Sequence, residues 1–237
     1  MKKTLILLRH GQSTYNLAHQ FTGWADAPLT PLGRQQAAQA GTLLKEAHLL
    51  PQRAYCSCLQ RAYQTLHEAL TQTQCPVPFQ ADWRLNERHY GDFQNRTRQE
   101  AARLYGLSRV LACRQTFFKA PPPAADNRAA FQVLPHGLTP PNGESLQQVQ
   151  KRALAFFTQA VFPAYACCDI QLVAAHEDLL RAMAVYFKKL PANAVENLVV
   201  PPAAPWIMEL DDTYHAAKDY FLGDQTQIAA FLKHRPQ

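Results

Sequence analysis

The sequence has no long hydrophobic run. No segment approaches the roughly 20 consecutive apolar residues that a helix needs to span a bilayer, so we expect no membrane association. The apolar run near the start, Thr4 to Leu8, stops at Arg9 and is shorter than the roughly 7–15 residues of a secretory signal core. We therefore predict a cytoplasmic protein.

Dense charge is also missing. The 24 Lys and Arg residues outnumber the 18 Asp and Glu residues, but they are scattered, with no basic block and no alternation of basic and aromatic residues. This pattern argues against nucleic acid as a partner. An excess of arginine suits small anionic ligands instead, because the guanidinium group binds two phosphate oxygens at once.

The six cysteines contain no pair with the C-x2-C spacing that is typical of zinc ligands. Adjacent Cys167 and Cys168 are poorly placed to bridge each other, so we predict free thiols in a reducing compartment. His176-Glu177 does not begin a metalloprotease motif, because Leu180 stands where the second His is needed. We predict no metal site.

Short apolar segments alternate with segments of helical periodicity along the chain. This alternation predicts an α/β fold with three layers, in which helices cover both faces of a mostly parallel sheet. We expect a single domain over residues 1–237. The expected strands are 4–8, 53–57, 170–175, 206–210 and one near Tyr220; the expected helices are 31–48, 59–71, 97–105, 108–118, 144–166, 179–190 and one from Gln225.

Residues 97–143 are expected to form an insertion of helices and loops. Pro121-Pro122-Pro123 cannot lie in a helix or a central strand, and the chain stays rich in Pro, Ala and Asn as far as Gly143. We predict that this insertion lies over one edge of the sheet as a lid.

Two of the expected strands end in a histidine. Strand 4–8 is followed by Arg9-His10-Gly11, and strand 170–175 is followed by His176. Ligands bind outside the carboxyl ends of strands in open α/β sheets, so one pocket could hold both rings. One such His is usually structural, but two together, with Arg9 and Arg61 to bind phosphate oxygens, favour a histidine nucleophile and a phosphohistidine intermediate.

A phosphoryl transfer of this kind also needs an acid that protonates the leaving oxygen. Glu87, in the segment Asn86-Glu87-Arg88-His89-Tyr90-Gly91, is the candidate. Beside Arg88 it could equally be half of a solvated ion pair, and the residues alone leave both readings open.

Four ordered motifs resemble the histidine phosphatase superfamily, and specifically its cofactor-dependent phosphoglycerate mutases. Residues 9–16 resemble the family's R-H-G-[EQ]-S-x-x-N motif, and residues 21–30 resemble the loop that follows it. Residues 57–62 match S-x-L-x-R-A, and residues 85–91 match the segment that separates mutases from most phosphatases. The resemblance covers nearly the whole chain.

The resemblance implies a role for each matching residue. His10 would be the phosphorylated nucleophile and Glu87 the proton donor, while Arg9, Arg61 and His176 would form the phosphate pocket. Contacts to substrate would come from Ser13, Asn16, Thr22, Gly23, Arg88, His89, Tyr90, Arg98 (where the family usually has Lys) and Arg114.

The activity implied by the resemblance is the interconversion of 3-phosphoglycerate and 2-phosphoglycerate in glycolysis and gluconeogenesis. The substrate would be this small phosphorylated three-carbon acid, and 2,3-bisphosphoglycerate would prime the enzyme as its cofactor. The family needs no metal, and analogy with it favours a homodimer or homotetramer.

The chain departs from the family pattern in three places. Gln115 replaces the second of two arginines, Glu177-Asp178 replace a Gly-Asn pair beside the catalytic phosphate, and residues 123–143 look shorter than in the mutases. A carboxylate at about 4 Å from a phosphate charge costs about 4 kcal/mol at an effective dielectric near 20. These departures leave two alternatives: a phosphatase acting on another phosphoester, or a weakened member with a binding role.

In the second alternative, Glu177 and Asp178 form ion pairs with Arg61, Arg98 or Arg181 and fill the pocket.

Overall fold

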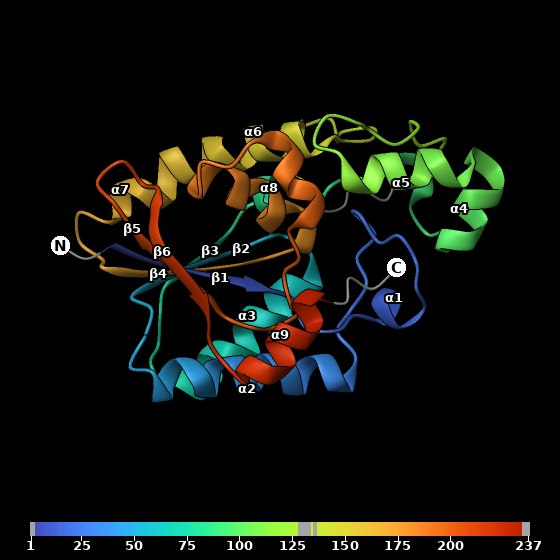
Figure 1. Ribbon diagram of the computed structural model, residues 1–237. Helices are drawn as coiled ribbons and strands as arrows, with labels where there is room; N and C mark the ends of the chain where they lie inside the picture. The colour runs from blue at the N-terminus through green and yellow to red at the C-terminus, as the bar shows by residue number, and fades with distance from the viewer. Residues whose placement is uncertain (1–2, 128–133, 135–136, 234–237) are drawn as a thin grey trace.

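The computed structural model describes residues 3–127, 134 and 137–233 (Figure 1). In this part of the chain the strands form one sheet in the order β3-β2-β4-β1-β5-β6. The first four strands of that order are mutually parallel, while β5 is antiparallel to β1 and β6 is antiparallel to β5. The strands are β1 Lys3–Arg9, β2 Arg53–Cys56, β3 Phe79–Ala81, β4 Ile170–Ala175, β5 Trp206–Leu210 and β6 Ala216–Phe221.

Helices cover both faces of this sheet, which confirms the predicted α/β fold. Figure 1 shows α2, α3 and α9 on one face and α6, α7 and α8 on the other. The helices are α1 Thr14–Leu17, α2 Pro31–Glu46, α3 Gln60–Thr73, α4 Arg98–Tyr105, α5 Leu107–Gln115, α6 Leu146–Phe156, α7 Phe162–Ala164, α8 Glu177–Phe187 and α9 Gln225–Lys233.

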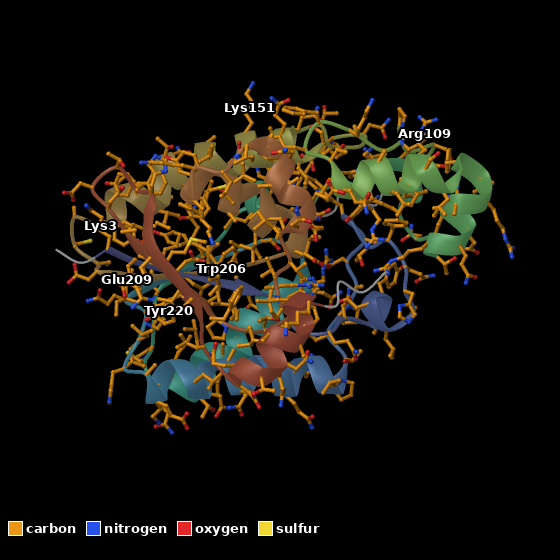
Figure 2. The ribbon with its side chains drawn as sticks, in the orientation of Figure 1. Lys3, Arg109, Lys151, Trp206, Glu209 and Tyr220 are labelled. Atoms are coloured by element: carbon orange, nitrogen blue, oxygen red, sulfur yellow. The ribbon has the colours of Figure 1, made fainter. Side chains whose placement is uncertain are left out.

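Strand β1 lies at the centre of two hydrophobic cores because its side chains alternate between the faces of the sheet. Leu5 and Leu7 pack into the core beneath α6 and α8, while Ile6 and Leu8 pack into the core beneath α2 and α3. All four side chains are completely buried. Figure 2 shows side chains filling both sides of the sheet, with Trp206 and Tyr220 on the antiparallel strands β5 and β6.

The register of β1 and β4 brings the two predicted histidines together. Arg9 is opposite Ala175 in the parallel pairing, so His10 and His176 both follow the last paired position. The amide of His10 continues the ladder by donating to the carbonyl of Ala175 at 3.0 Å. The strand pairing therefore fixes the place of both imidazoles.

Helix α2 begins against the turn that carries His10. Thr30 caps the helix by accepting a hydrogen bond from the amide of Gly33, and Pro31 stands at the first helical position. A Cβ atom on Gly11 would lie 2.2 Å from the carbonyl oxygen of Gly33. Glycine at position 11 thus permits a close approach that no larger residue allows.

Three elements differ from the sequence expectations. The expected helix 144–166 is interrupted by a π-helical turn at Phe157–Val161, beside Pro163, which has no amide hydrogen for a regular helical bond. Strand β3 was not expected, because all three of its side chains are exposed and show no alternation. The four-residue helix α1 is too short to give a periodic pattern.

Helices α4 and α5 belong to the insertion predicted over residues 97–143. Figure 1 shows them beyond the carboxyl ends of the central strands, beside α1. The stretches 128–133 and 135–136 of the predicted lid lie outside the described residues. Within the described chain, no helix combines the length and the hydropathy needed to cross a membrane.

Candidate active site

His10 is held as a neutral, buried base at the end of β1. Its Nδ1 lies 2.7 Å from the carbonyl oxygen of Gly11, so Nδ1 carries the proton and donates it there. Burial, followed by the positive charges of Arg61 and Arg9, lowers the pKa of His10 well below its usual value. The lone pair of Nε2 is then available for attack.

His176 is the N-cap residue directly before α8 and lies edge-on to His10, with 5.1 Å between the ring centroids. Its Nε2 is 2.7 Å from the hydroxyl oxygen of Ser57, which also accepts a hydrogen bond from the amide of Leu59. We assign the Ser57 hydroxyl as the donor to Nε2, and this assignment places the ring proton of the neutral His176 on Nδ1. Burial, followed by Arg61, lowers the pKa of His176 well below its usual value.

Arg61 of α3 is buried beside both rings. Its terminal nitrogens donate to the carbonyl oxygens of Gly23 at 2.8 Å and Ala25 at 3.0 Å. Burial lowers its pKa to about 10, so the guanidinium stays charged at neutral pH.

Three buried donors of the site find no hydrogen-bond partner among the described residues: Arg9 Nε, Arg61 Nε and His176 Nδ1. Buried polar groups without partners are costly. A phosphoryl group beside His10 would supply the acceptor oxygens that these donors lack.

Glu87 presents a buried carboxyl group to the same cavity. Its Oε1 accepts the backbone amide of Arg88 at 2.9 Å, and its own carbonyl oxygen accepts the indole N–H of Trp24 at 2.6 Å. Burial, and then the charge of Asp178, raises the pKa of Glu87 to about 7. A carboxyl group that is protonated near neutral pH can act as a general acid.

The cavity around these groups has a volume of about 100 Å³. Ten of the residues predicted from the sequence line it, which places the predicted nucleophile, the predicted proton donor and several cations together. They are Arg9, His10, Asn16, Thr22, Gly23, Arg61, Glu87, Tyr90, Arg98 and Arg114.

Four other predicted residues do not line this cavity. His176 lies next to it, against the ring of His10, while Ser13 caps α1. Arg88 is fully buried and donates to the carbonyl of Cys113 at 2.7 Å. His89 is fully buried and contacts Asn127 through Nε2 at 2.7 Å.

Asp178 provides the partner that holds Arg88. One carboxylate oxygen lies 2.8 Å from Arg88 Nη2 and accepts the Tyr90 hydroxyl at 2.5 Å, and the other accepts Arg181 Nη1 at 2.7 Å. Burial alone would raise the pKa of Asp178, but Arg88 and Arg181 outweigh it and hold the pKa below its usual range. The group is an anion that carries its own counter-charges.

Glu177 pairs with Arg9 at 3.0 Å, and both residues line the cavity. The sequence suggested Arg61, Arg98 or Arg181 as partners of the two acids. Arg181 does pair with Asp178, but Glu177 pairs with Arg9, and the two terminal nitrogens of Arg61 donate to carbonyl oxygens. The residues of both pairs line the cavity, and a volume of about 100 Å³ remains between them and the other lining residues.

Gln20 and Phe21 line the cavity and were not predicted. Phe21 lies just before the matched Thr22-Gly23, and its ring packs on Tyr90 with 5.0 Å between centroids. The sequence predicts Ser57 only as the first residue of the matched motif 57–62, although its hydroxyl contacts His176. Phe21 and Ser57 both lie in matched motifs, and this position was the signal from which they could have been predicted.

No group of metal-binding side chains occurs among the residues that the structure describes. All six cysteines are described, and each is a free thiol.

The fold and the site together define an α/β enzyme with a buried histidine in an arginine-rich pocket. The model of the histidine phosphatase superfamily (branch 1) matches residues 5–126 and 115–221. The chain therefore belongs to the histidine phosphatase superfamily.

Two relatives that match nearly the whole chain are named as phosphoglycerate mutases. The chain is 36% identical over 238 residues to a 2,3-bisphosphoglycerate-dependent phosphoglycerate mutase of Parabacteroides distasonis, covering 98% of this chain and 96% of the relative. A protein of the same name from Bacteroides fragilis is 36% identical over 241 residues, with the same coverage.

Solved structures with this fold include phosphatases. Mycobacterial glucosyl-3-phosphoglycerate phosphatase aligns with a TM-score of 0.73 at 25% identity, over 93% of this chain and 97% of that one. A structure described as a putative α-ribazole-5'-P phosphatase from Escherichia coli aligns with a TM-score of 0.71 at 23% identity, over 95% and 98% of the two chains, and shows the shared fold.

Proposed function

We propose that this protein is a phosphoglycerate mutase, which interconverts 3-phosphoglycerate and 2-phosphoglycerate through phosphorylated His10. The observation that carries the proposal is that neutral His10 and protonatable Glu87 line one arginine-rich cavity. The relatives named as mutases support the choice of substrate. On this basis we also propose a cytoplasmic enzyme of glycolysis and gluconeogenesis that forms a homodimer or homotetramer.

The chemical step follows from the protonation states of the two groups. Nε2 of His10 attacks the phosphorus atom, the P–O ester bond breaks, and its electron pair stays on the leaving oxygen. Glu87 gives its proton to that oxygen. In the return step a substrate hydroxyl takes the phosphoryl group from His10, the P–N bond breaks, and Glu87 accepts the proton of that hydroxyl. Arg61 and the Nδ1–H of His176 stabilise the charge on the remaining phosphoryl oxygens.

The pocket also fits 2,3-bisphosphoglycerate as primer. The unpartnered donors of Arg9, Arg61 and His176 suit one phosphoryl group, and Arg98 and Arg114 line the cavity as further cations. When bound, this compound supplies the phosphoryl group that His10 carries. The residues of the pocket hold the phosphoryl oxygens and keep Glu87 protonated.

Phosphorus NMR tests the proposal directly. Purified protein receives 3-phosphoglycerate and a trace of 2,3-bisphosphoglycerate, and we expect a 2-phosphoglycerate signal to grow. The His10→Ala variant should show no conversion. Equal turnover by this variant, or no 2-phosphoglycerate from the wild type, would refute the mutase assignment.

A phosphatase acting on another phosphoester is the second candidate. The adjacent acids Glu177 and Asp178, called the acidic pair below, favour it. Asp178 occupies donors of Arg88, Tyr90 and Arg181, and Glu177 occupies Arg9, so fewer cations remain for a second anionic group. A phosphatase needs only one phosphoryl site. Release of inorganic phosphate without any primer, in the same NMR experiment, would identify it.

A further inference from the structure

Arg152 of α6 uses every N–H donor of its guanidinium group. Nε and Nη2 bind the carboxylate of Glu144 at 2.7 and 2.9 Å. Nη1 donates to the carbonyl oxygens of Arg84 and Asn86, each at 2.8 Å, and Nη2 also donates to that of Glu87 at 2.8 Å. A single buried cation thus binds three backbone carbonyls of the segment that carries the proton donor.

Glu144 binds the same segment from the other side. Its carboxylate accepts the amide of His89 at 2.8 Å, and its own amide donates to the carbonyl of His89 at 2.8 Å. The Arg152–Glu144 pair therefore makes hydrogen bonds to the backbone at both ends of the stretch 84–89.

Trp24 links this arrangement to the phosphate side of the cavity. Its indole N–H shares the Glu87 carbonyl with Arg152, and its ring lies 5.8 Å from the Arg152 guanidinium. The carbonyl oxygen of the preceding residue, Gly23, accepts a hydrogen bond from Arg61. The backbone of Glu87 is thereby fixed relative to the cation that binds phosphoryl oxygens.

We propose that Arg152, together with Glu144, is a positioning residue that holds the Glu87 carboxyl group in line with the leaving oxygen. This rests on the proton-donor role of Glu87 in the proposed function. Arg152 is not among the residues that line the cavity, so it acts through the Glu87 backbone and not on substrate. A misplacement of about 1 Å is enough to weaken catalysis strongly.

Lysine cannot replace this arginine. An ammonium group keeps the charge but has three donors and no planar fork, so it cannot reach the carboxylate and three carbonyls together. Arg152→Lys should therefore leave the fold in place while loosening Glu87. Arg84→Lys is the matched control, because Arg84 lies on the same segment but its guanidinium binds Asp82 and Gln159 instead.

The test compares two phosphoesters that differ in their need for a proton donor. A nitrophenyl phosphate loses a stable phenolate without protonation, whereas an alkyl ester such as 3-phosphoglycerate needs the proton. We expect Arg152→Lys to lose at least about ten-fold more kcat on the alkyl ester than on the aryl ester, as part of the roughly 10²–10⁴-fold that a general acid contributes. Glu87→Gln should show the same selectivity, and Arg84→Lys should not.

A second measurement does not depend on turnover. Carbon NMR of labelled glutamate follows the titration of Glu87, whose burial raises its pKa. In Arg152→Lys the titration should move toward that of an exposed glutamate, even if the wild type proves inactive on phosphoglycerate. An unmoved titration together with equal losses on both esters would overturn the proposal and leave Arg152 a structural residue only.

Discussion

The guanidinium of Arg88 lies 2.8 Å from the carboxylate of Asp178, and both side chains are almost completely buried. Arg88 matches the family pattern, whereas Asp178 stands where that pattern has an uncharged asparagine. The acid is compensated by the arginines on either side of it, and Glu87 experiences its negative charge directly. The pair thus links a departure in sequence to the protonation of the catalytic acid.

The Asp178→Asn variant should lose activity at lower pH than the wild type. Transfer of a phosphoryl group from an ester to His10 requires protonated Glu87, so the rate of this step falls as pH rises through the pKa of that group, which is about 7. Removing the Asp178 charge makes ionised Glu87 less unfavourable and lowers this pKa, so the alkaline limb of the kcat/KM profile moves toward acid.

The pH–rate profile must be measured at a temperature below the unfolding transition of the Asp178→Asn variant, because breaking a buried ion pair lowers the stability by about 3–5 kcal/mol. Asp212→Asn is a suitable control, since its carboxylate is exposed and pairs with Lys3. An alkaline limb that stays in place in Asp178→Asn would contradict the predicted charge effect.

Glu177→Gln should lower the KM for an anionic substrate while leaving kcat nearly unchanged. The change frees the Arg9 guanidinium, which Glu177 holds at 3.0 Å. Partly exposed ion pairs are worth about 0.2–1 kcal/mol, so the gain should be up to about five-fold and should shrink as salt is added. Initial-rate kinetics at two ionic strengths measure it, and Glu68→Gln, which breaks the remote pair with Arg34, is the control. A raised KM would show that Glu177 assists binding.

Ser57→Ala should reduce kcat by about two- to ten-fold, in line with one hydrogen bond of about 0.5–1.5 kcal/mol. The hydroxyl fixes which nitrogen of His176 carries the proton, and its loss lets the ring exchange between tautomers. Nitrogen NMR of the imidazole should show this mixture directly. Cys58→Ala, at the neighbouring half-buried position, should leave both readouts unchanged. If His176 keeps an unaltered tautomer in the Ser57→Ala variant, the assignment of its ring proton is refuted.

Gly11→Ala should destabilise the protein by about 1–3 kcal/mol, the usual cost of overpacking. The new methyl group would lie 2.2 Å from the carbonyl oxygen of Gly33, so either the start of α2 or the His10 turn must move. Urea unfolding gives the change in stability, and steady-state kinetics give the accompanying loss of activity. Unchanged values of both would mean that the two backbones separate without cost.

The sequence was sufficient to predict most of the helices and strands and the proximity of His10 and His176. Buried strands that end in Arg-His-Gly and in His have carboxyl ends at one edge of a parallel sheet, which predicts that one pocket can hold both rings. The pairing of β1 with β4 in the structure then brings His10 and His176 together. Glu87 could be proposed as an acid but not shown to be buried. That property depends on tertiary packing.

The sequence could not give the partners of the acidic pair. Residues 177 and 178 are adjacent, yet the first turn of α8 directs Glu177 to Arg9 and Asp178 to Arg88 and Arg181. Local spacing identifies only the i,i+3 partner, Arg181. The Arg152 contacts escaped prediction for the same reason, since their acceptors are backbone carbonyls that carry no signature in the sequence.

The placement of His10 and His176 directly after the last paired position of β1 and β4 affects how the protein loses activity when heated. Leu5 to Leu8 and Leu172 to Ala175 are completely buried at the centre of the sheet. Their amide hydrogens should exchange with solvent only through global opening, because central strands lie in the most protected cooperative unit of a domain. The two rings cannot then separate before the sheet does, so heat inactivation and loss of the fold should occur at the same temperature.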